Sequence, residues 1–369
     1  MIKSKFKFVG AAIIPKDKTS GEPGERFFKK WEGGQSKTLP MAVINFGIKE
    51  SEHNAGYVEL FGMQYNPIKT IDKDFNKIEI ALENRFDEDC IKTVASYRKH
   101  YIDLGEDFGG SREFISDYDA AEFLAEWLPK YKGKIMVTGI WEKDVYKGQF
   151  KDKFVINNVY AVAEDSRPKL ELSMDFFYDA DSVDMSSYKD DEKIYVNGYV
   201  AQYVDKDTGV KYFPQTAILS SAKYDKQNED HMKKWAYKKS YIEIPSKKKI
   251  YHMPWECRLI NGTEEVEFDE SMLTAKQREQ IELGVRDLEW FKPKGAIYGD
   301  KVREIRLFDP MLYPEFGDGI IEVEMTRTEF EDEIYHPVEE EKLEDVILAA
   351  KDQDKPQFED TLDDEEDLF

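Results

Sequence analysis

Apolar and polar residues alternate along several stretches of the first 165 residues, as expected for strands that bury one face. Residues 5–14 (KFKFVGAAII) alternate lysine with phenylalanine and predict the first strand. Three more strands are predicted at 41–48, 56–63 and 76–82. The intervening stretch 15–40 is rich in Gly and Lys, which predicts a long loop.

Helical spacing of apolar residues replaces this alternation at 87–101 and 116–131. The second segment begins at Ser116 or Asp117, either of which can cap a helix, and Gly133 lies just past its end. Both segments therefore predict helices.

Residues 134–163 predict a hairpin that turns at Lys147–Gly148. Residues 193–219 repeat its pattern, because seven positions match at a constant offset of 59 without gaps and with strand parity kept. The match suggests an internal duplication of a β-hairpin unit.

The remaining elements are predicted from shorter patterns. A Lys-rich helix is predicted at 225–239 and another helix at 272–290. Further strands are predicted at 240–244, 247–260, 302–308 and 319–325.

The order of these elements predicts a mainly β fold with some α-helix. Three strands, a helix and a hairpin are the order of an OB barrel, a small five-stranded barrel that binds oligonucleotides. We expect an OB-fold domain at 1–165, a second OB-like domain with helical elaboration at 166–335, and a disordered acidic tail at 336–369. For the second domain two alternatives stay open: one elaborated OB barrel, or a barrel with a small α/β unit.

The net charge of −23 argues against a nucleic-acid partner until its distribution is considered. Residues 338–369 hold fourteen Asp or Glu against three Lys and so carry −11 of that total. Residues 231–260 hold eight Lys or Arg against two Glu. A polyanion interacts with local charged patches rather than with the net charge of the whole chain, so a basic groove is compatible with an acidic protein.

Composition and motifs argue against several other classes. Cys90 and Cys257 lie far apart and no Cys/His cluster occurs, so we expect no zinc site, no other metal and no cofactor. The N-terminus lacks the apolar run of a signal peptide, and no stretch of roughly 18 apolar residues occurs, so we expect a cytoplasmic protein without a membrane partner. No phosphate-loop, dinucleotide, zinc-protease or nucleophile-elbow motif is found, so we expect neither catalysis nor a small-molecule substrate.

Aromatic and basic residues occur together in four places. Sequence-independent binding of single strands uses this combination, because rings stack on bases and cations neutralise phosphates. The candidates in the first loop are Arg26, Phe27, Phe28, Lys29, Lys30 and Trp31. Those of the first hairpin are Trp141, Lys143, Tyr146, Lys147 and Phe150, and those of the second are Tyr199, Tyr203, Lys206, Lys211 and Tyr212. The Lys-rich helix contributes Lys233, Lys234, Trp235, Lys238 and Lys239.

Several of these aromatic residues also have a structural interpretation. Trp141 shares strand parity with core candidates and can close the core instead. Trp235 can be a buried anchor of its helix. The loop residues Phe27, Phe28 and Trp31 can fold back as a lid, although exposed aromatics in a loop favour binding.

Residues 120–162 resemble bacterial and phage single-stranded DNA-binding proteins, in which a helix leads into a Val-rich strand with a central Gly and a hairpin bearing Tyr, Trp and Lys. Residues 196–219 and 45–62 resemble parts of the same proteins. Members of this family often end in an acidic run closed by an aromatic residue, and this chain ends in Asp363, Asp364, Glu365, Glu366, Asp367, Leu368 and Phe369.

The resemblance implies that the acidic tail occupies the DNA groove when DNA is absent and otherwise binds replication or recombination proteins. This chain lacks the Pro that commonly precedes the final Phe, which leaves the identity of such a partner open. A tail that only increases solubility is the alternative.

We therefore expect a phage-type protein that binds single-stranded DNA in DNA replication, recombination or repair, without catalysis. One alternative is a metal-dependent nuclease or other DNA-processing enzyme that uses Asp175, Asp179, Asp181 and Asp184, which otherwise form a solvated interdomain linker. Another is an acidic virion protein or DNA mimic.

Overall fold

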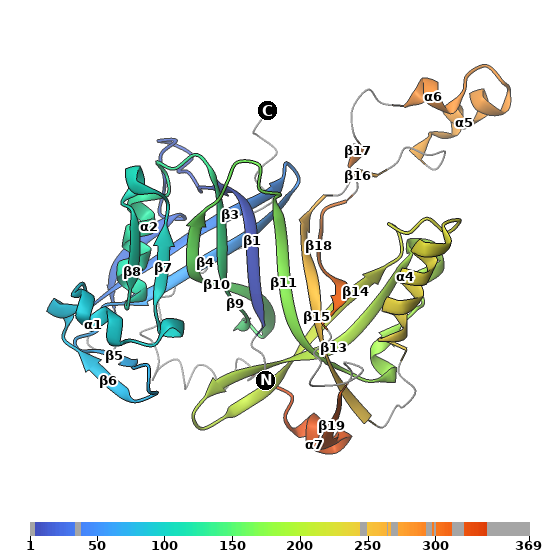
Figure 1. The fold of residues 1–369 in the computed structure, drawn as a ribbon. Coiled ribbons are helices and arrows are strands. Elements are labelled where there is room, and N and C mark those ends of the chain that lie inside the picture. The colour runs from blue at the N-terminus through green and yellow to red at the C-terminus, as the bar shows by residue number, and fades with distance from the viewer. Residues whose placement is uncertain are drawn as a thin grey trace.

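The computed structural model describes residues 4–33, 38–243, 249–263, 265–266, 272–292, 297–298, 300–311 and 321–337. Within these residues fifteen strands form one continuous sheet, so the fold is mainly β (Figure 1). None of the described helices is long and apolar enough to cross a membrane. Apart from residues 336 and 337, the predicted acidic tail lies outside the described residues.

Five strands of the first half pair into a closed circuit. Each strand pairs with the next in the order β1 (Lys5–Ile13), β3 (Leu39–Ser51), β4 (Asn54–Met63), β10 (Gln149–Ala161), β9 (Lys134–Tyr146) and back to β1. The β4–β10 pair is parallel and the other four pairs are antiparallel. Alternate residues of these strands point inward, and the core includes Phe6, Phe8, Ile44, Phe46 and Val137.

Helix α2 (Asp117–Trp127) lies between β4 and β9 in the chain and packs against β3 and β4. As predicted, Ser116 caps this helix, because its hydroxyl accepts a hydrogen bond from the backbone N–H of Asp119. Gly62 of β4 allows the close approach, since a Cβ atom there would lie 2.1 Å from the backbone nitrogen of Tyr118.

The stretch between β4 and α2 forms a small unit beside the first circuit. Its elements are β5 (Ile68–Ile71), β6 (Lys77–Ile80), α1 (Glu88–Thr93), β7 (His100–Asp103) and β8 (Ser111–Phe114), with 3-10 turns at Leu82–Asn84, Ser96–Arg98 and Glu106–Phe108. β5 and β6 form a separate pair over their own apolar cluster, whereas β7 extends the large sheet beside β10. The helix predicted at 87–101 is therefore wrong beyond Thr93, where the backbone becomes extended at Val94.

Five strands of the second half form a second closed circuit. Its order is β11 (Lys169–Tyr178), β13 (Lys193–Asp205), β14 (Gly209–Ser220), β18 (Val302–Pro310), β15 (Lys249–Gly262) and back to β11. The β14–β18 pair is parallel, as is β4–β10 in the first circuit. Helix α4 (Glu229–Ser240) lies between β14 and β15, as α2 lies between β4 and β9. The two halves repeat one arrangement of five strands and a helix.

The two similar hairpins of the sequence occupy different places in this repeat. In chain order, β9 and β10 are the last two strands of the first circuit, whereas β13 and β14 are the second and third strands of the second circuit. The sequence match at an offset of 59 therefore does not mark the structural repeat, in which β11 corresponds to β1.

β1 and β11 join the two circuits into one sheet. They pair antiparallel from Lys5 opposite Ser173 to Val9 opposite Lys169, and lie side by side at the centre of Figure 1. A second contact lies at the end of β15, where the backbone N–H of Asn261 donates to Asn54 Oδ1 at 2.8 Å.

The remaining elements surround the two circuits. β2 (Phe28–Gly33) pairs with β3, and a 3-10 turn (Ala180–Ser182), β12 (Val183–Asp184) and α3 (Tyr188–Asp191) connect β11 to β13. An arm between β15 and β18 projects away from the sheet in Figure 1 and contains β16 (Glu265–Val266), α5 (Ala275–Glu282), α6 (Leu288–Phe291) and β17 (Ile297–Tyr298). The described part ends with β19 (Ile321–Thr326), which pairs with β15, and α7 (Arg327–Asp332).

Four local predictions are wrong. The loop predicted at 15–40 contains β2, and residues 241–243 follow α4 as a turn rather than a strand. The helix predicted at 272–290 is two short helices. The Asp-rich stretch is not a solvated linker, because Asp175 is buried within β11 and pairs with His252.

A buried polar cluster holds the β9–β10 hairpin against β13 and β14. The Lys143 ammonium donates hydrogen bonds to Asp152 Oδ1 at 2.6 Å and to Gln215. The side-chain amide of Gln202 exchanges two hydrogen bonds, of 2.6 and 3.0 Å, with the backbone of Lys143. The sequence predicts a DNA contact for Lys143, but its side chain is only 7% exposed and is used in this cluster.

Replacing Asp152 by Asn removes the charge that compensates the buried Lys143 ammonium. We expect the free energy of unfolding, measured by urea denaturation, to fall by roughly 3 kcal/mol, because a buried ion is left without its counter-charge. Asp144→Asn, on the exposed part of the same hairpin, is the control and should change that free energy by less than about 0.5 kcal/mol. Equal effects of the two substitutions would contradict this role of Asp152.

Candidate nucleic-acid interface

One face of the β2–β3–β4 sheet carries aromatic and basic side chains outside the core. Directly paired residues point to the same side of a sheet, so Lys29 and Phe61, which both flank Val43, share this face. Trp31 lies two residues from Lys29 and its ring centroid is 5.9 Å from that of Phe61. Tyr57, four residues before Phe61, is 37% exposed. We call Lys29, Trp31, Tyr57 and Phe61 the open face.

A buried cation adjoins the open face where β4 meets β10. Lys153 of β10 pairs with Glu59 of β4 at 2.7 Å. Burial of this ammonium opposes its charge, but the carboxylates of Glu59, Asp144 and Glu142 together outweigh the burial and raise the pKa of Lys153. Lys153 therefore stays protonated at neutral pH beside the aromatic side chains.

The end of the β9–β10 hairpin forms a second aromatic and basic group. Lys147 and Gly148 have φ angles of 50° and 72°, which the tight turn predicted here requires. The ammonium groups of Lys147 and Lys151 lie 5.2 and 4.9 Å from the ring centroid of Tyr146. The structure thus brings together two predicted residues, Tyr146 and Lys147, and adds Lys151.

The structure places the candidates of the predicted first loop in different surroundings. Phe27 is buried in the core, so the prediction that its ring is available for stacking is wrong. Lys30 lies on the opposite side of β2 from the open face and pairs with Glu122 of α2. Lys29 and Trp31 lie on the open face. The other two candidates are Arg26, which is exposed, and Phe28, which is half-buried beside Lys30.

Two aromatic candidates of the first hairpin, Trp141 and Phe150, pack against other parts of the protein. Trp141 is buried and its indole N–H donates to Asp152 Oδ1 at 2.9 Å, so the core interpretation of Trp141 is confirmed. The Phe150 ring packs against Phe213 of the second hairpin, with a centroid distance of 5.8 Å.

Two aromatic candidates of the second hairpin, Tyr199 and Tyr212, lie where the chain itself covers the sheet. Tyr212 is buried and Tyr199 is half-buried, and both contact Phe330 of α7, with centroid distances of 4.3 and 5.3 Å. Burial raises the pKa of both phenols. Lys211 pairs with Glu333 at 2.6 Å. The exposed candidates of this hairpin are Tyr203 and Lys206.

The Lys-rich helix α4 is anchored rather than free. Trp235 is buried and stacks on Tyr188 at a centroid distance of 5.9 Å, which confirms the anchor interpretation. Lys238 pairs with Asp309 at 3.0 Å and lies 4.7 Å from the ring centroid of Phe308. The other candidates are Lys233 and Lys239, paired with Glu229 and Glu243, and Lys234, which is exposed.

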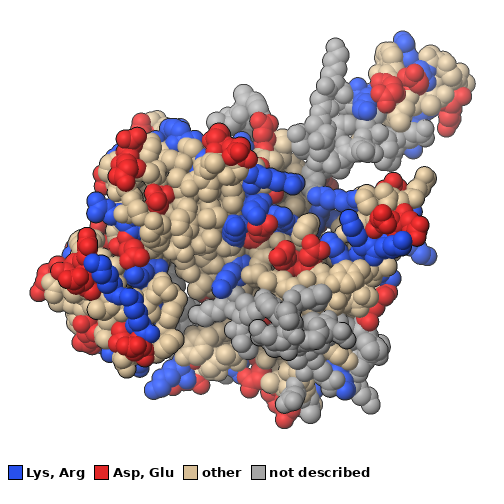
Figure 2. Space-filling model, in the orientation of Figure 1, with Lys and Arg blue, Asp and Glu red and all other residues tan. Residues whose placement is uncertain are grey.

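A groove of about 450 Å³ at the joint of β1 and β11 was not among the predicted sites. Lys5, Lys7, Arg258 and Phe308 are among its lining residues, and the Arg258 guanidinium lies 5.0 Å from the Phe308 ring centroid. Figure 2 shows Lys and Arg side chains gathered near the middle of the view, with acidic side chains among them. The alternation of lysine and phenylalanine at 5–8 signals that these lysines share a face, but their approach to Arg258 depends on the pairing of β11 with both β1 and β15.

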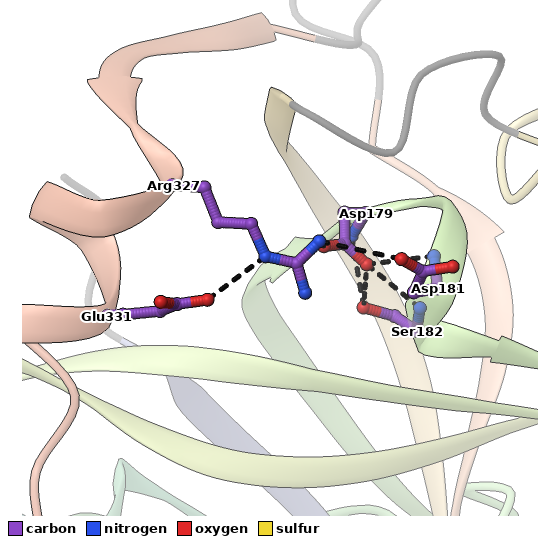
Figure 3. Close-up of polar contacts among 5 residues, drawn as sticks. All are labelled: Asp179, Asp181, Ser182, Arg327 and Glu331. Atoms are coloured by element: carbon purple, nitrogen blue, oxygen red, sulfur yellow. Dashed lines mark hydrogen bonds and ion pairs between the residues drawn. The ribbon is translucent and has the colours of Figure 1, made fainter.

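Of the carboxylates on which the nuclease alternative depends, Asp175 and Asp179 are buried and have structural partners. Asp175 pairs with His252. Asp179 caps the 3-10 turn by accepting from the backbone N–H groups of Asp181 and Ser182, and it pairs with Arg327 at 3.2 Å (Figure 3). Within the described ranges, no group of three or more His, Cys, Asp or Glu side chains is arranged to hold a metal ion.

The comparisons with known proteins find similarity among solved structures. No protein-family model matches the chain, and no curated protein matches it. Among solved structures, the chain is similar to a deletion mutant of the single-stranded DNA binding protein from Thermus aquaticus, with a TM-score of 0.30 and 10% sequence identity. The match covers 70% of this chain and 87% of the other. At this TM-score and identity, the similarity supports no inference about residues or activity.

Proposed function

We propose that the chain binds single-stranded DNA without sequence preference, through two OB barrels and without catalysing a reaction. The strand pairing supports this proposal. Each circuit closes five strands, and one helix precedes the fourth strand, an arrangement that fits the small OB barrel. We place the first barrel within 1–165 and the second, with its helical elaboration, within 166–335.

The observation that carries the proposal is the position of the open face. OB barrels bind oligonucleotides on the face of their second and third strands and on the loops beside it. In the first circuit these strands are β3 and β4, on which Phe61 and Tyr57 lie, and β2 adds Trp31 and Lys29. Rings of this kind stack on any base, and lysines beside them release counterions from phosphates.

The end of the β9–β10 hairpin extends this surface in the proposal. It connects the fourth and fifth strands of the first barrel, and the corresponding loop of OB barrels also contacts oligonucleotides. Tyr146 would stack on a base there, while Lys147 and Lys151 would contact phosphates. We propose that this binding serves phage DNA replication, recombination or repair.

Replacing Trp31 by Ala removes one stacking ring from the open face. We expect binding of labelled oligo-dT, followed by fluorescence anisotropy, to weaken by about 1–3 kcal/mol. Phe75→Ala is the control, because Phe75 is 76% exposed but lies on the turn between β5 and β6. A Trp31 variant that binds like the wild type would exclude the open face as the site, and a wild-type protein that binds no oligo-dT at low salt would contradict the proposed function.

Deleting residues 338–369 removes a net charge of −11 from the chain. If the tail competes with DNA, the shortened protein should bind oligo-dT more tightly, and the gain should shrink as added salt screens the tail. The same titration at low and high ionic strength measures both effects. Unchanged affinity would favour a tail that only increases solubility, and would leave the partner-binding role of Leu368 and Phe369 to be tested separately.

A further inference from the structure

The second circuit has a counterpart of the open face that is covered by the chain itself. Its second and third strands are β13 and β14, and Tyr199 and Tyr212 lie on one side of this pair because Ala201, two residues after Tyr199, is directly opposite Tyr212. Phe177 of β11 is opposite Tyr199 and joins the same side. Three aromatic side chains therefore line the face that corresponds to the open face of the first circuit.

Residues 327–335, which we call the strap, cover this aromatic side. Helix α7 places Phe330 on it with 1% of its surface exposed, and the ring centroid of Phe330 lies 4.3 Å from that of Tyr212 and 6.4 Å from that of Phe177. The strap then crosses the edge of β14. There the backbone N–H of Tyr212 donates to the carbonyl of Glu333 at 3.0 Å, and the N–H of Tyr335 donates to the carbonyl of Tyr212 at 2.9 Å.

Ion pairs fasten the strap at both ends. Near its C-terminal end, Glu333 pairs with Lys211. At its start, Arg327 pairs with Glu331 at 3.0 Å and reaches Asp179 and Asp181 of the 3-10 turn, as Figure 3 shows. The Arg327 side chain is 43% exposed, so water and salt weaken these contacts.

We propose that the strap is a displaceable cover over a second single-strand site, in which Phe330 takes the place of a stacked base and Glu333 the place of a phosphate. The inference rests on the proposed function of the first barrel. A base can stack on Tyr212 in the place of the Phe330 ring, which packs on Tyr212 at an interplanar angle of 36°, and a phosphate can pair with Lys211 as the Glu333 carboxylate does. DNA bound there would also repel the strap, which carries Glu329, Glu331, Asp332 and Glu333 against Arg327.

The strap can open without unravelling the strand before it. β19 ends at Thr326 and pairs with β15 independently of the strap. Helix α7 has only six residues, too few to be stable away from the surface on which it packs. Opening therefore requires a change at the junction of β19 and α7, while the five strands of the second circuit keep their pairing.

Two single-charge substitutions in the full-length chain test the proposal. Glu333→Gln removes the carboxylate that pairs with Lys211, and Asp332→Asn removes the same charge from an exposed side chain that has no ion-pair partner among the described residues. We expect Glu333→Gln to tighten oligo-dT binding by about two- to five-fold relative to Asp332→Asn at low salt. The difference should disappear at high salt.

Hydrogen exchange of the wild-type protein, with and without saturating oligo-dT, supplies the second measurement. Amides of residues 327–335 should exchange at least about tenfold faster with DNA bound, because the strap is displaced, while the amides of β1 should be unchanged. If DNA binds but the strap keeps its protection and the two variants bind alike, the strap inference is overturned and the proposed function stands. If neither the wild type nor Glu333→Gln binds oligo-dT, the proposed function falls and the strap inference with it.

Discussion

The antiparallel pairing of β1 with β11 is the contact on which the rest of the molecule depends. Phe6 and Phe8 of β1 lie opposite Leu172 and Leu170 of β11, so all four side chains point to the buried side of one sheet. A slip of one residue would move these side chains to the solvent side and bring lysines inward, which makes the register strongly specified. One register therefore fills both cores and also places the exposed lysines of β1 at the joint groove.

The elements that the sequence predicts well are those whose pattern is complete within a few residues. The first strand, the two hairpins and helix α2 have regular alternation or helical spacing and a recognisable turn or cap. Strand β11 alternates too, at Leu170, Leu172, Met174 and Phe176, but the aspartates around it suggested a linker. Burial of Asp175 is possible because His252 of β15 forms a hydrogen bond with it. His252 is 77 residues away in the chain, so no local sequence pattern predicts this pair.

Some candidate residues are buried by a segment that lies outside their own strand pair. The alternation of residues along a strand does not reveal this burial. On β2, parity correctly separates Lys30, which pairs with Glu122 of α2, from Lys29 and Trp31 on the open face. It does not reveal that α7 returns over Tyr212, that Tyr188 stacks on Trp235, or that Gln215 of β14 accepts a hydrogen bond from the buried Lys143. Each of these burials depends on a segment distant in the chain, and only the assembled sheet brings the partners together.

An acidic chain can bind a polyanion only where its own carboxylates are distant from the bound strand or lie on a segment that can be displaced. At physiological ionic strength the Debye length is about 8 Å, so carboxylates well beyond that distance from a bound strand add little repulsion. The carboxylates close to the bound strand therefore determine whether it binds. Each aromatic face has one such carboxylate paired with a lysine: Glu59 with Lys153 on the first face, and Glu333 with Lys211 on the second. Glu59 is part of β4 and stays in place, whereas Glu333 belongs to the strap. On the proposed mechanism, the first face therefore has a constant charge, and the second gains a free cation only when DNA displaces the segment that neutralises it.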